Sequence, residues 1–200
     1  MSFPSPHDAQ NPQELSGTKP FAGFEIVRRT TVLRGRKFDF EQFVYRTAAG
    51  KELHREVVRH PGAVLIVALT AANQVVLIAN RRPTVNRELL ECCAGTMEAG
   101  EAPEVTAARE LIEETGYSAG SLAKLSEFYT SPGLSDEVMH AYFAQDLTHI
   151  GQQLEEDEAI TVVLVPVAEA LAMTLDGRMI DAKSMLCLHL AKARGWLPSA

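Results

Sequence analysis

Three glutamates, Glu110, Glu113 and Glu114, have the types and spacing in this 200-residue chain that most clearly predict chemistry. On an α-helix each residue turns by about 100°, so Glu113 and Glu114 flank Glu110 on one face. Like charges placed this way repel each other, and the helix dipole disfavours them near a helix C-terminus. A divalent cation would compensate, and carboxylate oxygens suit Mg²⁺ or Mn²⁺ better than zinc. An isolated motif of this kind is more often a solvated acidic face. The neighbouring sequence therefore decides whether a metal site is the better interpretation.

A loop containing two glycines precedes these glutamates. The segment from residue 95 to 117 reads GTMEAGEAPEVTAARELIEETGY. It resembles the Nudix box, a family pattern of Gly, five residues, Glu, seven residues and then Arg-Glu-U-x-Glu-Glu-x-Gly-U, where U is a bulky apolar residue. Every fixed position of that pattern is filled here, with Tyr117 as the last U.

The resemblance implies a loop–helix–loop that binds divalent cations and hydrolyses a nucleoside diphosphate linked to another group. It assigns the metal ligands by position: Glu110 and Glu114 as the main ligands, Glu113, and the carbonyl of Ala94. It gives the other box residues a structural role, with an ion pair between the second and third of them: Gly95, Glu101, Arg109 and Gly116.

The charge of the chain bears on the substrate. A net charge of −7 argues against nucleic-acid or membrane partners, because both are polyanions. A diphosphate near one carboxylate is repelled by about 4 kcal/mol in a surface-like medium. A bound divalent cation reverses this sign and acidifies a coordinated water, so the acidic balance still permits a small nucleotide substrate.

The segment before the box narrows the resemblance. Residues 80–91, NRRPTVNRELLE, resemble the corresponding segment of ADP-ribose and nucleotide-sugar pyrophosphatases. Arg82 and Glu91 match the arginine and glutamate of that subgroup and are expected to bind substrate. An arginine fork on phosphate is reasonable chemistry, although a solvated edge charge is the alternative for Arg82. The chain departs from the pattern at Asn80-Arg81 and at Cys93, which leaves the details of the substrate open.

Two segments after the box also resemble this subgroup. In residues 129–137, YTSPGLSDE, Pro132 and Gly133 are expected to contact substrate. The acidic loop 154–158, LEEDE, would supply a catalytic carboxylate, with Glu158 the first choice and Glu156 the second. Glu113 is the third candidate, although a run of acids is ordinarily a solvated surface.

Patterning predicts the elements that position these residues. The most distinct helix is 103–115, with proline at its start and glycine after its end, and a second helix is expected at 181–194. Strands are expected at 24–34, 38–47, 51–58, 63–71, 74–80, 89–93, 122–129, 137–144 and 161–166. This order of elements indicates a mixed sheet between helices. Together with the resemblance, it implies the class α/β (α+β): a Nudix-type α/β/α sandwich with a mixed sheet, preceded by a small antiparallel sheet.

The same patterning divides the chain into a flexible leader at 1–20, an N-terminal sheet at 21–59 and a Nudix domain at 60–197. The subgroup typically dimerises through the N-terminal sheet, so a homodimer is expected. Aromatic residues of that sheet are candidates for stacking on the base: Phe38, Phe40, Phe43 and Tyr45.

The cellular setting follows from what the sequence lacks. No apolar run reaches the roughly 20 residues of a membrane helix, and residues 1–10 lack a signal-like pattern. Cys92, Cys93 and Cys187 are an odd number without metal spacing, which favours buried thiols in a reducing cytoplasm.

The function predicted from the sequence is Mg²⁺- or Mn²⁺-dependent hydrolysis of ADP-ribose to AMP and ribose 5-phosphate. The first alternative keeps the chemistry but takes another sugar nucleotide, such as GDP-mannose or ADP-glucose. The second is a non-catalytic sensor on the same fold, although such proteins tend to lose box carboxylates and this chain retains them. An acidic Ca²⁺ module is weaker, because the EF-hand loop pattern is absent.

Overall fold

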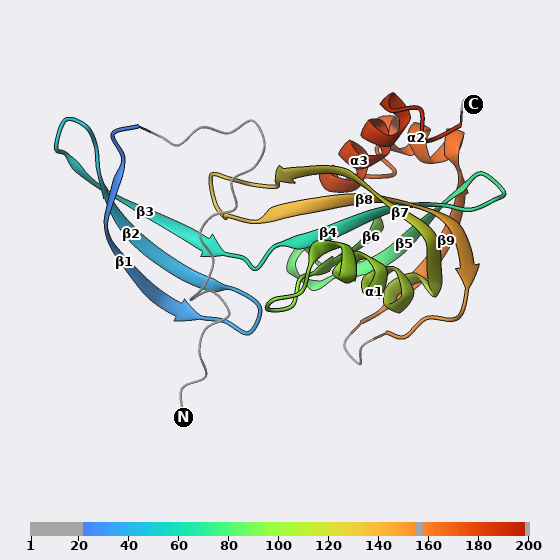
Figure 1. The fold of residues 1–200 in the computed structure, drawn as a ribbon, viewed down its shortest axis with the longest axis horizontal. Helices are drawn as coiled ribbons and strands as arrows, with labels where there is room; N and C mark the ends of the chain where they lie inside the picture. Colours follow the sequence, from blue (N-terminus) through green and yellow to red (C-terminus); the bar gives the residue numbers. More distant parts are fainter. Residues whose placement is uncertain (1–21, 155–157, 199–200) are drawn as a thin grey trace. The chain divides into compact units, whose positions relative to one another are not determined.

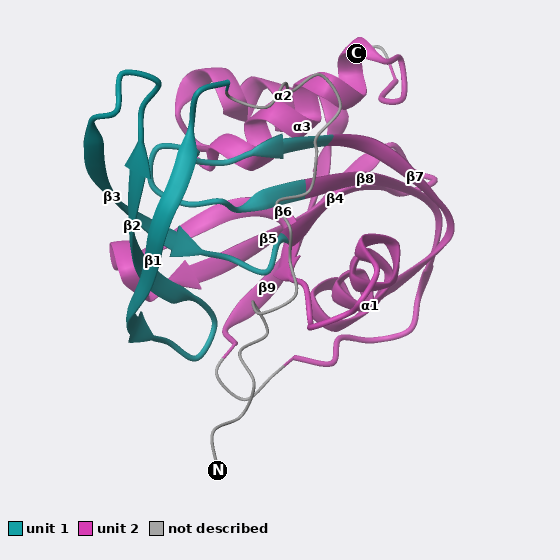
Figure 2. Ribbon diagram, turned by 60° about the vertical axis from the view of Figure 1, so that its left-hand side comes forward, with its two compact units in different colours: residues 1–62, 127–139 teal, residues 63–126, 140–200 magenta. Residues whose placement is uncertain are grey.

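The structure, a computed structural model, describes residues 22–154 and 158–198. The chain divides into two compact units, coloured separately in Figure 2. Unit 1 comprises residues 1–62 and 127–139, and unit 2 comprises residues 63–126 and 140–200. The predicted leader at 1–20 lies outside the described residues.

Unit 1 contains a three-stranded antiparallel sheet in the order β1-β2-β3. Its strands are β1 (Glu25–Arg34), β2 (Asp39–Arg46) and β3 (Glu52–Arg59). The expected hairpin turn joins β2 to β3, and Gly50 adopts the left-handed φ of 77° that such a turn favours. The prediction of a small antiparallel sheet before the main domain is therefore confirmed.

A second segment of unit 1, Glu127–Met139, folds against the end of β3. The Val58 N–H donates to the Leu134 carbonyl at 2.9 Å, and the Asp136 N–H donates to the Val58 carbonyl at 3.2 Å. Arg59 Nη1 also lies 2.5 Å from Asp136 Oδ2. These contacts fix the loop from Ser131 to Asp136 on the three-stranded sheet.

Unit 2 is built around a six-stranded sheet in the order β7-β8-β4-β6-β5-β9. In Figure 1, α1 covers one face of this sheet, and α2 and α3 cover the other. The strands are β4 (Ala63–Leu69), β5 (Gln74–Arg82), β6 (Arg87–Thr96), β7 (Tyr117–Tyr129), β8 (Val138–His149) and β9 (Ile160–Pro166). The helices are α1 (Pro103–Thr115), α2 (Val167–Asp176), α3 (Ala182–Ala193) and a 3₁₀ turn, η1 (Pro83–Val85). The predicted fold class is confirmed.

Strand β4 forms the centre of the core because both of its faces are covered. All seven of its residues are buried, as its continuous apolar sequence predicts. Its alternate residues Val64 and Ile66 pack in one cluster with Ala107 and Leu111 of α1. Burial of a side chain such as Leu111 contributes about 1.5–3 kcal/mol, so this contact seats the acidic helix on the sheet.

Helix α1 has the predicted bounds. Pro103 occupies its first turn, and Gly116 ends it with a left-handed φ of 74°. The Gly116 N–H donates to the Ile112 carbonyl at 2.8 Å, while the N–H groups of Ile150 and Gly151 donate to the Gly116 carbonyl. The residues that follow β8 therefore complete the helix terminus.

Helix α2 was not predicted from the sequence. No polar loop separates it from β9: the strand ends at Pro166 and the helix begins at Val167. Gly177, in the left-handed conformation with φ 85°, ends it. Pro166 and Gly177 were the available sequence signals for this helix.

Strands β7 and β8 are longer than predicted, because packing between neighbouring strands extends them beyond the apolar segments. Among the described residues, no helix is both long and apolar enough to span a bilayer.

The two helix-ending glycines of unit 2 provide a matched prediction. A Cβ at Gly116 would lie 2.7 Å from the Gly151 carbonyl carbon, whereas a Cβ at Gly177 would meet nothing within 4 Å. Gly177→Ala should therefore cost about 1 kcal/mol from backbone strain alone. Gly116→Ala should cost about 3 kcal/mol because the backbone must also move. Urea denaturation of both variants checks this, and equal costs would contradict it.

Candidate active site on the acidic helix

Arg109 is the central cation of the acidic helix. Its Nε and Nη2 contact the two oxygens of Glu101 at 3.1 and 3.0 Å. Its Nη1 contacts Glu110 at 2.9 Å and Glu113 at 2.7 Å. One guanidinium thus joins the loop to the helix and offsets three carboxylates at once.

Glu110 lies directly against the loop backbone at Gly95. A Cβ on Gly95 would lie 1.9 Å from the Glu110 carboxyl carbon. Glycine at position 95 leaves this space to the Glu110 carboxylate, which a larger side chain there would displace. The side chain is buried, with 8% of the residue exposed.

Glu114 occupies the next turn and is more deeply buried, at 3% exposure. Its Oε2 accepts a hydrogen bond of 3.0 Å from the Ala94 N–H, and the Cys93 side chain also hydrogen bonds to it. The Ala94 N–H thus orients this carboxylate, and the metal-ligand role that the resemblance implies for the Ala94 carbonyl stays a prediction.

Burial raises the pKa of both carboxylates. The pKa of Glu110 rises to about 7, mainly through burial, although the charge of Arg109 opposes the shift. The pKa of Glu114 also rises to about 7 through burial, although hydrogen bonds from Ala94 and Cys93 oppose it. The charge of Glu158 raises both pKa values, which places this residue within electrostatic range of the helix. Glu156 lies outside the described residues.

The charges of this cluster fit a divalent cation. The cluster holds four carboxylates (Glu101, Glu110, Glu113 and Glu114), of which Arg109 contacts the first three, and two of the four are largely desolvated. Within residues 22–154 and 158–198, no three His, Cys, Asp or Glu side chains are close enough to hold a metal as they stand. The reason is local: Arg109 contacts both Glu110 and Glu113, and Glu114 turns to Ala94. The oxygen donor set suits Mg²⁺ or Mn²⁺.

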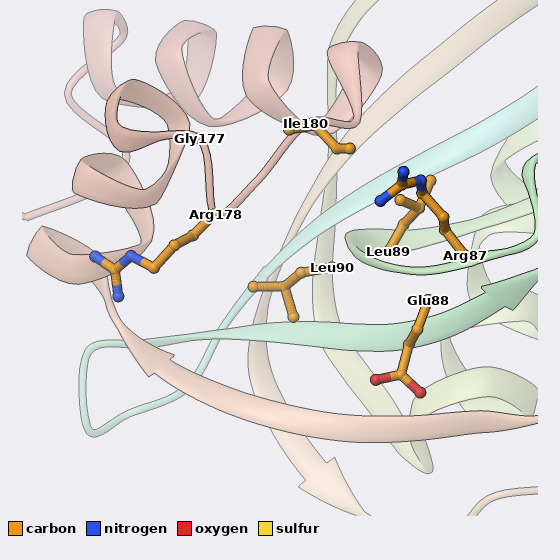
Figure 3. Close-up of a pocket in the computed structure, with 7 residues that line it drawn as sticks. All are labelled: Arg87, Glu88, Leu89, Leu90, Gly177, Arg178 and Ile180. Atoms are coloured by element: carbon orange, nitrogen blue, oxygen red, sulfur yellow. The ribbon is translucent and has the colours of Figure 1, made fainter.

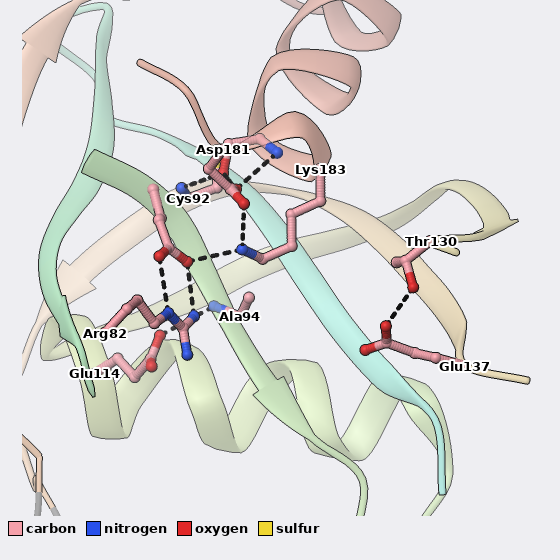
Figure 4. Close-up of polar contacts among 10 residues, drawn as sticks. Arg82, Cys92, Ala94, Glu114, Thr130, Glu137, Asp181 and Lys183 are labelled. Atoms are coloured by element: carbon pink, nitrogen blue, oxygen red, sulfur yellow. Dashed lines mark hydrogen bonds and ion pairs between the residues drawn. The ribbon is translucent and has the colours of Figure 1, made fainter. Parts of the chain in front are cut away.

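Arg82, Glu91 and Lys183 form a second ionic cluster in unit 2, and Figure 4 labels Arg82 and Lys183. Arg82 Nε donates to Glu91 Oε1 at 2.8 Å and Nη2 donates to Oε2 at 2.7 Å. Lys183 Nζ contacts the same Oε2 at 2.7 Å. Glu91 is completely buried and its pKa is lowered by these cations against the effect of burial. Its carboxylate is therefore already engaged, whereas the Arg82 side chain is 37% exposed.

Pro132 and Gly133 lie in unit 1, in the exposed loop that follows β7. The N–H groups of Leu134 and Ser135 both donate to the Ser131 carbonyl, which closes a tight turn around these two residues. At the base of this loop Thr130 hydrogen bonds to Glu137 (Figure 4).

A shallow pocket of about 240 Å³ lies elsewhere in unit 2, between the start of β6 and the turn after α2 (Figure 3). Its lining residues are Arg87, Glu88, Leu89, Leu90, Gly177, Arg178 and Ile180. Arg178 is paired with Asp176 and Glu169, and none of the acidic-helix residues lines the pocket. This pocket therefore does not contain the carboxylate cluster.

Comparison with known proteins supports the same chemistry. Residues 59–186 match the NUDIX domain family. The chain belongs to the Nudix family. It is 37% identical to the ADP-ribose pyrophosphatase of Bacillus subtilis (strain 168) over 82% of this chain and 90% of that protein. It is 39% identical to the GDP-mannose pyrophosphatase of Yersinia enterocolitica over 72% of this chain and 80% of that protein.

A solved structure, described as an ADP compounds hydrolase, superposes with a TM-score of 0.76. It is 26% identical and covers 90% of this chain and 97% of that one. The Nudix box of this chain is thus α1 together with the loop that joins it to β6. Sequence reasoning did not find the contacts of Arg109 with Glu110 and Glu113, although the four-residue spacing of Arg109 and Glu113 was a usable signal.

The Glu101–Arg109 pair should show in the pH dependence of stability. Hydrogen bonding to Arg109 lowers the pKa of Glu101 from 4.5 to about 2. A lowered folded-state pKa stabilises the protein above the unfolded pKa, and this contribution is lost as the pH falls from 4.5 towards 2. Glu101→Gln should therefore be less stable than the parent protein at pH 7, and the difference should shrink through this window. Urea denaturation at several pH values measures it, and a constant difference would contradict the assignment.

Proposed function

We propose that this Nudix protein hydrolyses the pyrophosphate bond of ADP-ribose, giving AMP and ribose 5-phosphate, or of a related nucleoside diphosphate sugar, with Mg²⁺ or Mn²⁺. The observation that carries this is the burial of Glu110 and Glu114 one turn apart, where two negative charges need a compensating cation. The names of the relatives, ADP-ribose pyrophosphatase and GDP-mannose pyrophosphatase, support the substrate class.

In this proposal, different side chains bind the cation and the diphosphate. Glu110 and Glu114 would hold the cation, with Glu113 and the Ala94 carbonyl assisting. When bound, the cation supplies charge neutralisation for the diphosphate and acidifies a coordinated water. Arg82 would contact a phosphate through the part of its guanidinium that Glu91 does not use.

Glu158 is the proposed general base, because its charge acts on both Glu110 and Glu114. Glu156 and Glu113 remain the second and third candidates. The 2.7 Å contact of Glu113 with Arg109 favours a role in holding the helix rather than in proton transfer. Pro132 and Gly133 remain proposed substrate contacts.

A second sugar nucleotide is a specific alternative, because a GDP-mannose pyrophosphatase shares 39% identity with this chain, close to the 37% of an ADP-ribose pyrophosphatase. A panel of ADP-ribose, ADP-glucose and GDP-mannose, with phosphatase-coupled phosphate detection, separates the candidates. A single preferred substrate would define the enzyme, and comparable rates would indicate a broad pyrophosphatase.

The Glu114→Gln variant distinguishes a metal-dependent hydrolase from a non-catalytic sensor with the same fold. We expect hydrolysis to fall by more than about a hundredfold, because losing a metal ligand exceeds the effect of losing an outer contact. Mn²⁺ affinity, measured by calorimetry, should fall in parallel. Glu104→Gln is the matched control, since Glu104 is an exposed acid in the first turn of the same helix. Undiminished hydrolysis by a folded Glu114→Gln protein would overturn the proposal.

We also propose that the protein is a homodimer in the cytoplasm, without nucleic-acid or membrane partners. Exposed apolar side chains on β1 support the dimer: Ile26, Val27, Val32 and Leu33. The three buried, free cysteines support a reducing compartment, and the net charge of −7 supports the absence of polyanionic partners.

Leu33→Glu should convert this dimer to a monomer, because a charge would be buried in the contact between copies. Leu175→Glu, at an exposed leucine of α2, is the matched control and should leave the dimer intact. Light scattering after gel filtration reports the mass. A monomeric parent protein, or a Leu33→Glu protein that stays dimeric, would contradict the proposed interface.

A further inference from the structure

Glu91 is the most deeply buried acid of the described residues, with 0% exposure. A buried carboxylate needs counter-charges and hydrogen bonds, and Glu91 receives three donors at 2.7–2.8 Å. Two of them come from Arg82 on the neighbouring strand β5. The third comes from Lys183 on α3, 92 residues away in the sequence. Arg82 and Lys183 thus approach the same carboxylate from different elements (Figure 4).

Lys183 is itself fixed at the start of α3. Its Nζ lies 2.7 Å from Asp181 Oδ1, while Asp181 Oδ2 accepts a hydrogen bond of 3.0 Å from the Ser184 N–H and so caps the helix. Ser184 Oγ in turn accepts a bond of 2.8 Å from the N–H of Cys92 on β6. The lysine is 18% exposed. It therefore lies within a network that joins the N-terminus of α3 to the strand carrying Glu91.

The network contains equal numbers of negative and positive side chains. Asp181 and Glu91 contribute two negative charges, and Lys183 and Arg82 contribute two positive ones. Glu91 engages the Nε and Nη2 edge of Arg82, which leaves Nη1 outside this pair. The charge of Glu114 also acts on Arg82, so the guanidinium lies near the acidic helix.

We infer that Lys183 is a positioning residue: from α3 it holds the Glu91 carboxylate in the orientation that presents Arg82 to the diphosphate. This inference rests on the proposed function. A free arginine side chain samples many rotamers, and fixing it before binding removes an entropic cost from substrate association. Glu91 and Asp181 engage two of the three N–H donors of Lys183, so its charge is already paired within the protein.

Lys183→Met tests the inference in the full-length protein with ADP-ribose. We expect KM to rise about tenfold, the effect of losing one charge-assisted hydrogen bond, while kcat changes little. Lys183→Arg should restore part of the loss. Lys192→Met is the matched control, since Lys192 lies in the last turn of the same helix and its Nζ donates to the Pro198 carbonyl at 2.8 Å. Its KM should stay within about twofold of the parent value.

A double-mutant cycle separates positioning from direct contact. Arg82→Ala should raise KM by itself, and adding Lys183→Met should have no further effect, because the lysine acts through Arg82. A further tenfold rise in the double variant would show that Lys183 binds substrate directly and would overturn the inference. A Lys183→Met protein with lower Tm but unchanged KM would show a structural role only and would overturn it as well.

A spectroscopic measurement keeps the inference testable without substrate or metal. The Arg82 Nε–H resonance, assigned by its loss in Arg82→Lys, should exchange slowly in the parent protein and faster in Lys183→Met. If the parent protein hydrolysed no sugar nucleotide, the proposed function would fail while this exchange rate still decided the positioning role. If Lys183→Met did not fold, the same measurement on Lys183→Gln would replace it. An unchanged Arg82 exchange rate would overturn the inference.

Discussion

Glu110 and Glu114 are buried carboxylates one helical turn apart, and burial disfavours the charged form of each and raises its pKa to about 7. The glycine at position 95 gives the first carboxylate its place, and the Ala94 N–H orients the second. Arg109, on the same helix, offsets part of the repulsion by pairing with Glu110. Because a buried charge is unfavourable without partners, this small region constrains the loop, the helix and strand β6 together.

Strand β6 contributes residues both to the acidic-helix site and to the cluster of Arg82, Glu91 and Lys183. Within the five residues from Glu91 to Gly95 it supplies a buried acid, two backbone N–H donors and the glycine beneath Glu110. Helix α1 covers one face of the sheet and α3 the other, so the two ionic clusters are supported from opposite sides (Figure 1). Rigid support on regular elements suits a site whose groups must be placed before the substrate arrives.

The acidic helix could be predicted from the sequence in full, because Pro103 and Gly116 mark its ends and the family pattern covers it. The Glu101–Arg109 pair, expected from the resemblance, is present at 3.1 and 3.0 Å. Helix α2 was missed because an apolar segment continues from the strand into the helix, and periodicity alone does not separate the two.

The contacts between distant segments could not be predicted. Lys183 lies 92 residues from Glu91, and only the tertiary fold brings the start of α3 to β6. The helix expected at 181–194 placed Lys183 near a helix start without indicating its partner. Similarly, the loop that carries Pro132 and Gly133 was recognised by its sequence, whereas its hydrogen bonds to Val58 depend on strand pairing in unit 1.

The cysteines of β6 have a practical consequence. Cys92 and Cys93 are completely buried beside Glu91 and Ala94, and burial raises the pKa of the Cys92 thiol to about 12. A small alkylating reagent therefore reacts with these sulfurs only when the strand parts from its covering helices. The alkylation rate of Cys92 and Cys93 in the native protein therefore reports how often the structure around β6 opens locally.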